Sequence, residues 1–323
     1  MDNLEKWKKE ILPDWENKKG SAYVRDMVNT FIFFQIYKNL IFEKNKIWKG
    51  IPQCLRGKVW PLLLGNRLRI TKELYLINCI RSNETVKKNF ENKDTSGKNH
   101  EDTVNLIPVD IGRTFPQLGF FQEGGPCHDQ LLHILQAFVC YRPDIGYVQG
   151  MSFIAAHLLL QMDPEISFCC MANMLSKSIF NSFFTFNMVN IRKYCLIFEE
   201  LLKNNLPAVS KQFEMLEIKS DMYLIDWIMT IFAKSLPLEI VGRIWDIYLL
   251  EGDSAIYRCA LTVLAYRKDF LSTAEFGDIL KYLNRPSSFK LCEATFFELI
   301  HQFRLPINFI KESYNKYNLN NQF

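Results

Sequence analysis

Apolar residues recur with a helical period along most of this chain, and that pattern restricts the possible folds more than any other feature of the sequence. Side chains spaced three and four residues apart share one face of a helix, which can then pack on a core. Sustained period-2 alternation and Asn-Gly or Asp-Gly hairpin turns are absent from the sequence. The sequence therefore predicts an all-α fold. The periodic stretches are 129–140, 149–162, 165–180, 190–203, 222–234, 238–250, 254–267, 273–284 and 289–303.

Local signals predict where two of these helices begin and where the helical pattern is interrupted. Asp163-Pro164-Glu165 places a capping acid before a proline in the first turn. Ser272-Thr273-Ala274-Glu275 has the spacing of a capping box. Residues 82–104 are rich in charge and poor in aliphatic side chains, so we expect a mobile surface excursion there.

A softer interruption falls near 181–190, where the helical period fades. Three aromatic residues of this stretch, Phe183, Phe184 and Phe186, have two interpretations. They pack in the core, which we favour, or they form a patch that faces a partner.

Composition excludes several classes of protein. The net charge of the 323-residue chain is only +4, without the clustered basic stripe of a nucleic-acid binder. Apolar runs are too short to span a bilayer, and the charged N-terminus lacks a signal-peptide core, so we expect a soluble, cytoplasmic protein without membrane insertion. Nine cysteines without a C-x-x-C pair predict reduced thiols rather than a zinc or redox site.

The usual nucleotide-binding and hydrolase motifs are absent as well. The sequence has no G-x-x-x-x-G-K-[ST] phosphate loop, no G-x-G-x-x-G, no H-E-x-x-H and no G-x-S-x-G. We therefore expect neither an independent active site nor a cofactor or metal of its own.

Two short segments, 107–116 and 147–154, are unusually polar or glycine-rich for a helical protein. In the first, Asp110 precedes Arg113 by three residues between prolines, so the carboxylate can orient a guanidinium to grip phosphate oxygens. The alternative is a local ion pair of little energetic value. In the second, Gln149 lies at or near a helix N-terminus, where it can hold a water or merely cap the helix.

An oriented arginine and a water-positioning glutamine are the two groups used in assisted GTP hydrolysis. Because the chain lacks a nucleotide pocket of its own, we infer that the nucleotide belongs to a partner. A third segment, 50–60, places Arg56 and Trp60 four residues apart on one helix face, where a cation–aromatic contact is the simplest interpretation.

Together these motifs resemble the signature of TBC-domain GTPase-activating proteins for Rab GTPases. The matching patterns are I-x-x-D-x-x-R at Ile107, Asp110 and Arg113, then Y-x-Q-G over 147–150, with R-G-x-x-W over 56–60 upstream. Further similarity runs from about residue 48 to residue 283, including Asp226-Trp227, Ser235-Leu236-Pro237 and Arg243-Ile244-Trp245-Asp246. Residues 124–156 are most similar to the subgroup of family members twelve and fourteen.

The resemblance implies a two-lobed helical fold with a groove for a GTP-bound Rab GTPase, which carries the GTP and the magnesium ion. It also implies that Arg113 is an arginine finger and Gln149 a glutamine finger. Asp110 would hold Arg113, while Tyr147 and Gly150 would shape the loop that presents Gln149. Arg56 and Trp60 would support the arginine loop or border the Rab surface.

The expected organisation has three parts. Residues 1–46 form an N-terminal helical extension, 47–285 form the TBC domain, and 286–323 form a helical segment packing on the C-terminal lobe. Within the domain, the N-terminal lobe covers about 47–185 and the C-terminal lobe starts at about 186.

The resemblance further implies a role in vesicle traffic, with recruitment to endomembranes through the Rab or another partner. Two alternatives stay open. One is a Rab effector or scaffold that binds GTP-bound Rab without accelerating hydrolysis. The other, which we regard as weaker, is a plain helical scaffold for unrelated partners.

Overall fold

The computed structural model describes residues 47–91 and 100–320. Within these ranges every regular element is helical and no strand occurs, which confirms the predicted all-α fold. The extension expected over 1–46 lies outside the described residues. The α-helices (α) and 3-10 helices (η) are α5 (Gln53–Leu64), α6 (Lys72–Glu91), η2 (His100–Leu106), α7 (Ile107–Gly112), η3 (Pro116–Leu118), α8 (His128–Tyr141), α9 (Met151–Leu159), α10 (Pro164–Leu175), α11 (Ser178–Phe184), α12 (Met188–Asn205), α13 (Pro207–Met215), α14 (Asp221–Thr230), α15 (Leu238–Glu251), α16 (Asp253–Tyr266), α17 (Lys268–Leu271), α18 (Phe276–Asn284), η4 (Pro286–Phe289), α19 (Glu293–Ile300) and α20 (Phe309–Asn320).

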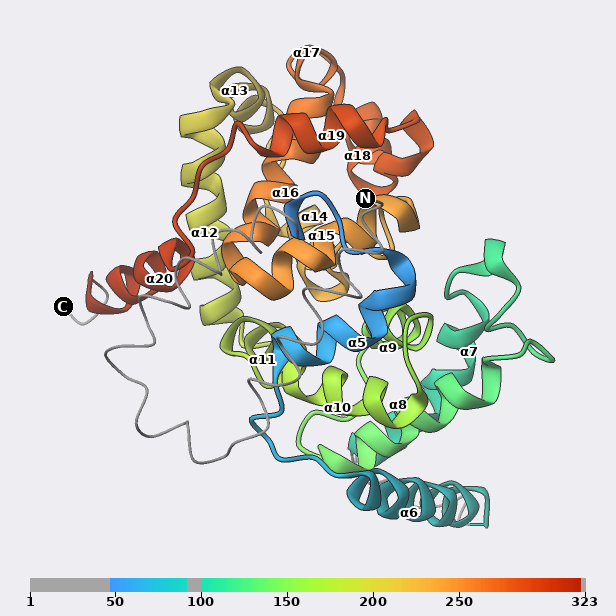
Figure 1. Ribbon diagram of the computed structural model, residues 1–323. Coiled ribbons are helices and arrows are strands. Elements are labelled where there is room, and N and C mark those ends of the chain that lie inside the picture. The colour runs from blue at the N-terminus through green and yellow to red at the C-terminus, as the bar shows by residue number, and fades with distance from the viewer. Residues whose placement is uncertain (1–46, 92–99, 321–323) are drawn as a thin grey trace, which may run out of the picture.

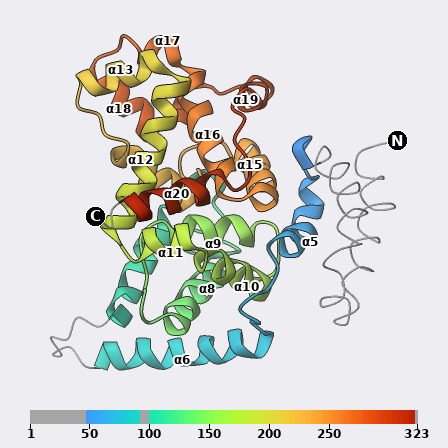
Figure 2. The same cartoon turned by 90° about the vertical axis from the view of Figure 1, so that its left-hand side faces the viewer.

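The helices form two lobes, which can be followed in two views (Figures 1 and 2). One lobe contains α6 to α11, with α6 at its far end, and the other contains α12 to α19, with α13, α17 and α18 at the opposite end. Three helices connect the lobes, because α5 packs on both α10 and α15, α11 packs on α10, α12 and α14, and α9 packs on α14. In the segment after residue 286, α19 packs on α16 and α20 packs on α12.

The two helix-start signals have different outcomes. Helix α10 begins at Pro164 with Asp163 at its N-cap, as predicted. The predicted capping box at 272–275 is wrong, because α18 begins at Phe276 and its N-cap, Glu275, makes no side-chain capping bond. The Ser272 hydroxyl instead donates to the Lys268 carbonyl oxygen at 2.6 Å, at the end of the short helix α17.

The expected surface excursion over 82–104 differs from the structure at both of its ends, and its middle, 92–99, lies outside the described residues. Residues 82–91 continue α6, and residues 100–106 form η2. Composition misled the prediction because extending an existing helix costs little compared with nucleating one, and lysine and glutamate are good helix formers. A polar sequence can therefore prolong an anchored helix.

The aromatic residues near 181–190 divide between the two interpretations. Phe183 and Phe184 lie on α11 and are buried in the core. Phe186 is 59% exposed and adopts a left-handed backbone, with a φ of 51°, at the break before α12. None of the nine cysteines, all of which the structure describes, forms a disulfide.

Candidate functional site

Asp110 and Arg113 lie on and directly after α7, a helix of six residues with a proline in its first turn. Asp110 faces inward, and its side chain is only 7% exposed, whereas that of Arg113 is 54% exposed. The Arg113 Nη2 atom lies 2.5 Å from Asp110 Oδ1. A fixed carboxylate thus orients a guanidinium whose other N–H groups remain accessible.

Tyr147 connects this ion pair to the segment that carries Gln149. Its hydroxyl donates to Asp110 Oδ2 at 2.6 Å, so the two carboxylate oxygens of Asp110 contact different partners. Burial, reinforced by the hydrogen bond to Asp110, raises the pKa of Tyr147 well above its usual value. The phenol therefore stays protonated and acts as a donor to the carboxylate.

Gln149 is exposed in the turn that precedes α9, and Gly150 is the N-cap of that helix. The φ of Gly150 is 102°, a conformation that side-chain-bearing residues rarely adopt. Glycine therefore lets the chain turn sharply from Gln149 into α9. At the other end of the turn, the Tyr147 backbone N–H donates to Thr103 Oγ1 at 2.7 Å.

A second bridge between the two segments escaped the sequence analysis. The Thr114 hydroxyl donates to the Asp110 carbonyl oxygen at 2.6 Å and lies 2.8 Å from Ser152 Oγ. Both side chains are buried. Thr114 and Ser152 are 38 positions apart, and nothing in the sequence pairs them. Each nevertheless lies close to a predicted site residue, Thr114 next to Arg113 and Ser152 three residues after Gln149.

The bridges bring Arg113 and Gln149 to one cavity of about 640 Å³, called here the Arg113 cavity. The N-terminal lobe contributes Phe115 and Phe153, whose rings meet edge to face with centroids 5.3 Å apart. The C-terminal lobe contributes residues that the sequence analysis did not assign to a site. These are Ala233, Lys234, Leu236, Pro237, Asn284, Arg285 and Ser287.

Arg56 and Trp60 lie elsewhere, on α5, where both contact Asp246 of α15. Arg56 Nε and Nη2 donate to its two carboxylate oxygens at 3.2 and 3.1 Å, Trp60 Nε1 donates at 2.7 Å, and the Ile51 N–H donates at 3.0 Å. Burial raises the pKa of Asp246, although Arg56, Trp60 and Ile51 favour its charged form. Gly242 makes room for this contact, because a Cβ there would lie 2.3 Å from Arg56 Nη1.

The structure therefore contradicts the idea that Arg56 and Trp60 border a partner's surface, since both are buried between α5 and α15. Trp60 is instead connected, through His157, to the segment that follows α7 and carries Arg113 and Phe115, called here the arginine loop. The ring centroid of His157 lies 5.5 Å from that of Trp60 and 6.5 Å from that of Phe115. Burial, with a smaller contribution from Arg56, lowers the pKa of His157 to about 3, so this ring packs as a neutral aromatic group.

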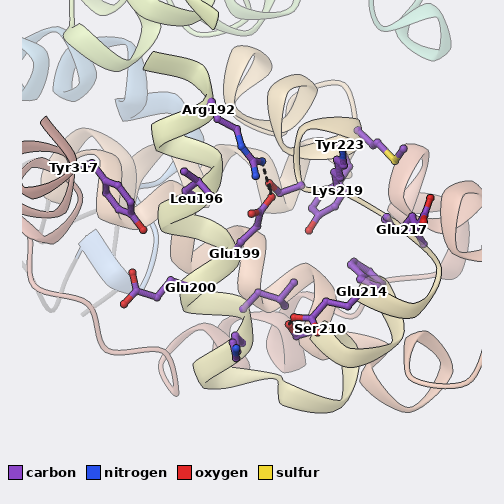
Figure 3. A pocket seen from close by; sticks show the side chains of 16 residues that line it. Arg192, Leu196, Glu199, Glu200, Ser210, Glu214, Glu217, Lys219, Tyr223 and Tyr317 are labelled. Carbon is purple, nitrogen blue, oxygen red and sulfur yellow. Dashed lines mark hydrogen bonds and ion pairs between the residues drawn. The ribbon is translucent and has the colours of Figure 1, made fainter. Parts of the chain in front are cut away.

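A second cavity, of about 880 Å³, lies where α12, α13 and α14 meet (Figure 3). Its charged residues have both signs, and some of them pair within it. Glu199 Oε1 accepts hydrogen bonds from Arg192 Nη1 at 3.1 Å and from Ser220 Oγ at 2.7 Å. Neither Arg113 nor Gln149 lines this cavity. The mixed charges of this cavity favour no single class of charged ligand.

Among residues 47–91 and 100–320, no group of three or more His, Cys, Asp or Glu side chains is arranged to hold a metal ion. In the same part of the chain, no helix is long and apolar enough to cross a membrane.

Comparison with known proteins assigns the chain to a class. The family model described as the Rab-GTPase-TBC domain matches residues 53–272. This chain therefore belongs to the TBC-domain family.

Individual relatives agree with this assignment. TBC1 domain family member 14 of Homo sapiens and TBC1 domain family member 12 of Xenopus tropicalis are each 40% identical over 287 residues. These alignments cover 86% of this chain but 39% of each relative, so the chain spans about two fifths of their length. Drainin of Dictyostelium discoideum is 31% identical over 339 residues, covering 93% of this chain and 74% of drainin.

Solved structures support the fold. The crystal structure of a Chlamydomonas flagellar RabGAP TBC domain gives a TM-score of 0.66 at 18% identity, with 94% of this chain and 96% of that chain covered. The Ypt/Rab-GAP domain of Gyp1p gives 0.65 at 17% identity, with 98% and 100% covered. These proteins share the two-lobed helical architecture of this chain.

Proposed function

We propose that this protein is a GTPase-activating protein for a Rab-family GTPase and that it supplies two catalytic groups, Arg113 and Gln149, to the partner's nucleotide site. The observation that carries the proposal is that both residues line one cavity and are joined through Asp110 and Tyr147. Membership of the TBC-domain family supports it independently.

In this mechanism, Arg113 contacts the transferring phosphoryl group and neutralises the charge that develops there. Asp110 pre-orients the guanidinium, so less conformational freedom is lost when the partner binds. An arginine of this kind accelerates hydrolysis by about 10³ to 10⁵ in known GTPases. Gln149 positions the attacking water, using one amide that both donates and accepts hydrogen bonds.

The partner supplies the rest of the site. GTP and magnesium are bound by the Rab in its GTP-loaded form, and this chain contributes no cofactor and no independent active site. Tyr147 and Gly150 hold the loop of Gln149, and Trp60 acts on the arginine loop at a distance, through His157 and Phe115. A cytoplasmic location, recruitment to endomembranes through the Rab and a role in vesicle traffic belong to the same proposal.

Single-turnover GTP hydrolysis across a panel of purified, GTP-loaded Rabs tests the proposal. We expect the wild-type protein to accelerate at least one Rab, and we expect Arg113→Ala and Gln149→Ala each to abolish the acceleration. Binding of the same Rab is measured alongside. A Rab that binds the wild type and both variants equally, without faster hydrolysis, would instead identify an effector or scaffold.

A further inference from the structure

The Arg113 cavity contains a second cation that is oriented by a carboxylate. Lys234 lines the cavity, and its Nζ atom lies 2.6 Å from Asp226 Oδ2. This pair parallels the 2.5 Å pair of Arg113 and Asp110. The Lys234 side chain is 39% exposed, so its ammonium group is held by one partner and remains open to another.

The backbone that carries Lys234 is fixed in an unusual conformation. Ile231 and Phe232 directly precede Ala233 and Lys234, and both have left-handed φ angles, 44° and 61°, although neither is glycine. Both are fully buried, and Trp245 Nε1 donates to the Ile231 carbonyl oxygen at 3.2 Å. Such conformations are unfavourable for residues that carry a side chain, and they persist only where packing enforces them.

The arginine loop has the same construction. Phe115, two residues after Arg113, is buried and has a φ of 44°. Each cation is thus carried by a rigid turn rather than by a free loop. Two rigid turns from opposite lobes therefore present Arg113 and Lys234 to the same cavity.

The charges that line the cavity have one sign. Arg285, at the junction of α18 and η4, is a third cation in the lining. Among the described residues, no aspartate or glutamate lines the Arg113 cavity, since Asp110 and Asp226 contact their cations from outside it. A concave surface with cations alone concentrates positive potential and attracts anionic groups.

We propose that Lys234, positioned by Asp226, is a third residue of this protein that contacts the bound GTPase, where it binds an oxyanion. The inference rests on the proposed function and adds a residue to it. The oxyanion is either a phosphoryl oxygen of the nucleotide or a carboxylate on the GTPase surface. An ammonium group suits both, because it is a compact charge with three donors.

Lys234→Met tests the inference, with Lys281→Met as the matched control. Lys281 also pairs with an aspartate, Asp278, at 2.9 Å on the protein surface, but it does not line the cavity. The assay measures kcat and KM for hydrolysis by the Rab that the panel identifies, with thermal unfolding as the check on folding. We expect Lys234→Met to lower kcat/KM about tenfold, the loss expected for one charge-assisted hydrogen bond, and Lys281→Met to change it little.

Three readouts separate contact with an anion from a merely structural role. The dependence of kcat/KM on salt concentration weakens in Lys234→Met, because one attractive charge is gone. Lys234→Arg recovers part of the lost kcat/KM. Asp226→Asn lowers kcat/KM less than Lys234→Met does. A fall in kcat alone identifies the phosphoryl oxygen as the target, and a rise in KM alone identifies the carboxylate.

The two proposals fail in different ways. If the wild type accelerates a Rab and Lys234→Met matches both the wild type and Lys281→Met in rate and salt dependence, the role of Lys234 is wrong while the proposed function stands. If the wild type accelerates no Rab, the proposed function fails and the role of Lys234 falls with it. Should Lys234→Met unfold at a lower temperature than the wild type, Lys234→Gln, which keeps a polar side chain, replaces it in the comparison.

Discussion

The hydrogen bond from Tyr147 to Asp110 links the segments of Arg113 and Gln149, and Tyr147→Phe removes it while preserving the ring. The bond is 2.6 Å long, buried, and accepted by a carboxylate. Losing a bond to a charged group costs about 1.5 to 3 kcal/mol. For a chain of this length, that loss lowers the unfolding midpoint by about 2 to 4 °C.

The functional consequence should be larger than the loss of stability alone would produce. Without the phenol, Asp110 loses one of its two partners and Arg113 is oriented less firmly. We expect the acceleration of Rab hydrolysis, measured by single turnover at a temperature where all variants are folded, to fall about tenfold, equivalent to 1.4 kcal/mol of transition-state stabilisation.

Tyr257→Phe provides the matched control. Tyr257 is also fully buried, and its hydroxyl donates to a neutral acceptor, the Tyr194 carbonyl oxygen, at 3.0 Å. We expect this variant to lose about 0.5 to 1.5 kcal/mol of stability without loss of acceleration. If Tyr147→Phe kept full acceleration, or if both variants lost it equally, the bridge through Asp110 would have no special role.

Three other predictions concern the core and the glutamine turn. Because the pKa of His157 is lowered to about 3, the unfolded state binds this proton between pH 6.5 and 3 and the folded state does not. The wild type should therefore lose stability on acidification relative to His157→Phe, by up to about 1.4 kcal/mol per pH unit in urea titrations. Parallel pH profiles of the two proteins would contradict this. Arg56→Met leaves the buried carboxylate of Asp246 without its ion-pair partner and should cost about 3 to 5 kcal/mol in urea unfolding, whereas a loss below 1 kcal/mol would refute this. Gly150→Ala places a side chain at a φ of 102° and should destabilise the fold by about 1 to 3 kcal/mol. It should also displace Gln149 and so lower the rate of stimulated GTP hydrolysis by the Rab. An unchanged rate would show that the turn tolerates a side chain.

The sequence was most informative where local pattern decides the structure. Helical period predicted the all-α class, and the proline at 164 marked the start of α10. The spacing of Asp110 and Arg113 predicted their ion pair, because three residues separate neighbours on one helical turn. Gln149 was expected at a helix N-terminus and lies one residue before the N-cap of α9.

Contacts between distant segments were beyond that kind of reasoning. Asp246 lies 190 residues from Arg56, and helical period does not say which helix faces which. The same limit hid the pairing of Thr114 with Ser152 and the presence of Lys234 in the Arg113 cavity. Residues 82–91 were mispredicted for a different reason: their composition suggested a mobile segment, whereas they continue helix α6.

The most direct test of the account compares Arg113→Ala, Gln149→Ala and the double variant in single-turnover GTP hydrolysis with the Rab that the wild type accelerates. Since both groups act on one transition state in one cavity, each single variant should remove nearly all the acceleration, and the double variant should lose little more. Binding of GTP-loaded Rab should persist in all three. Full acceleration by either single variant would contradict the two-residue mechanism.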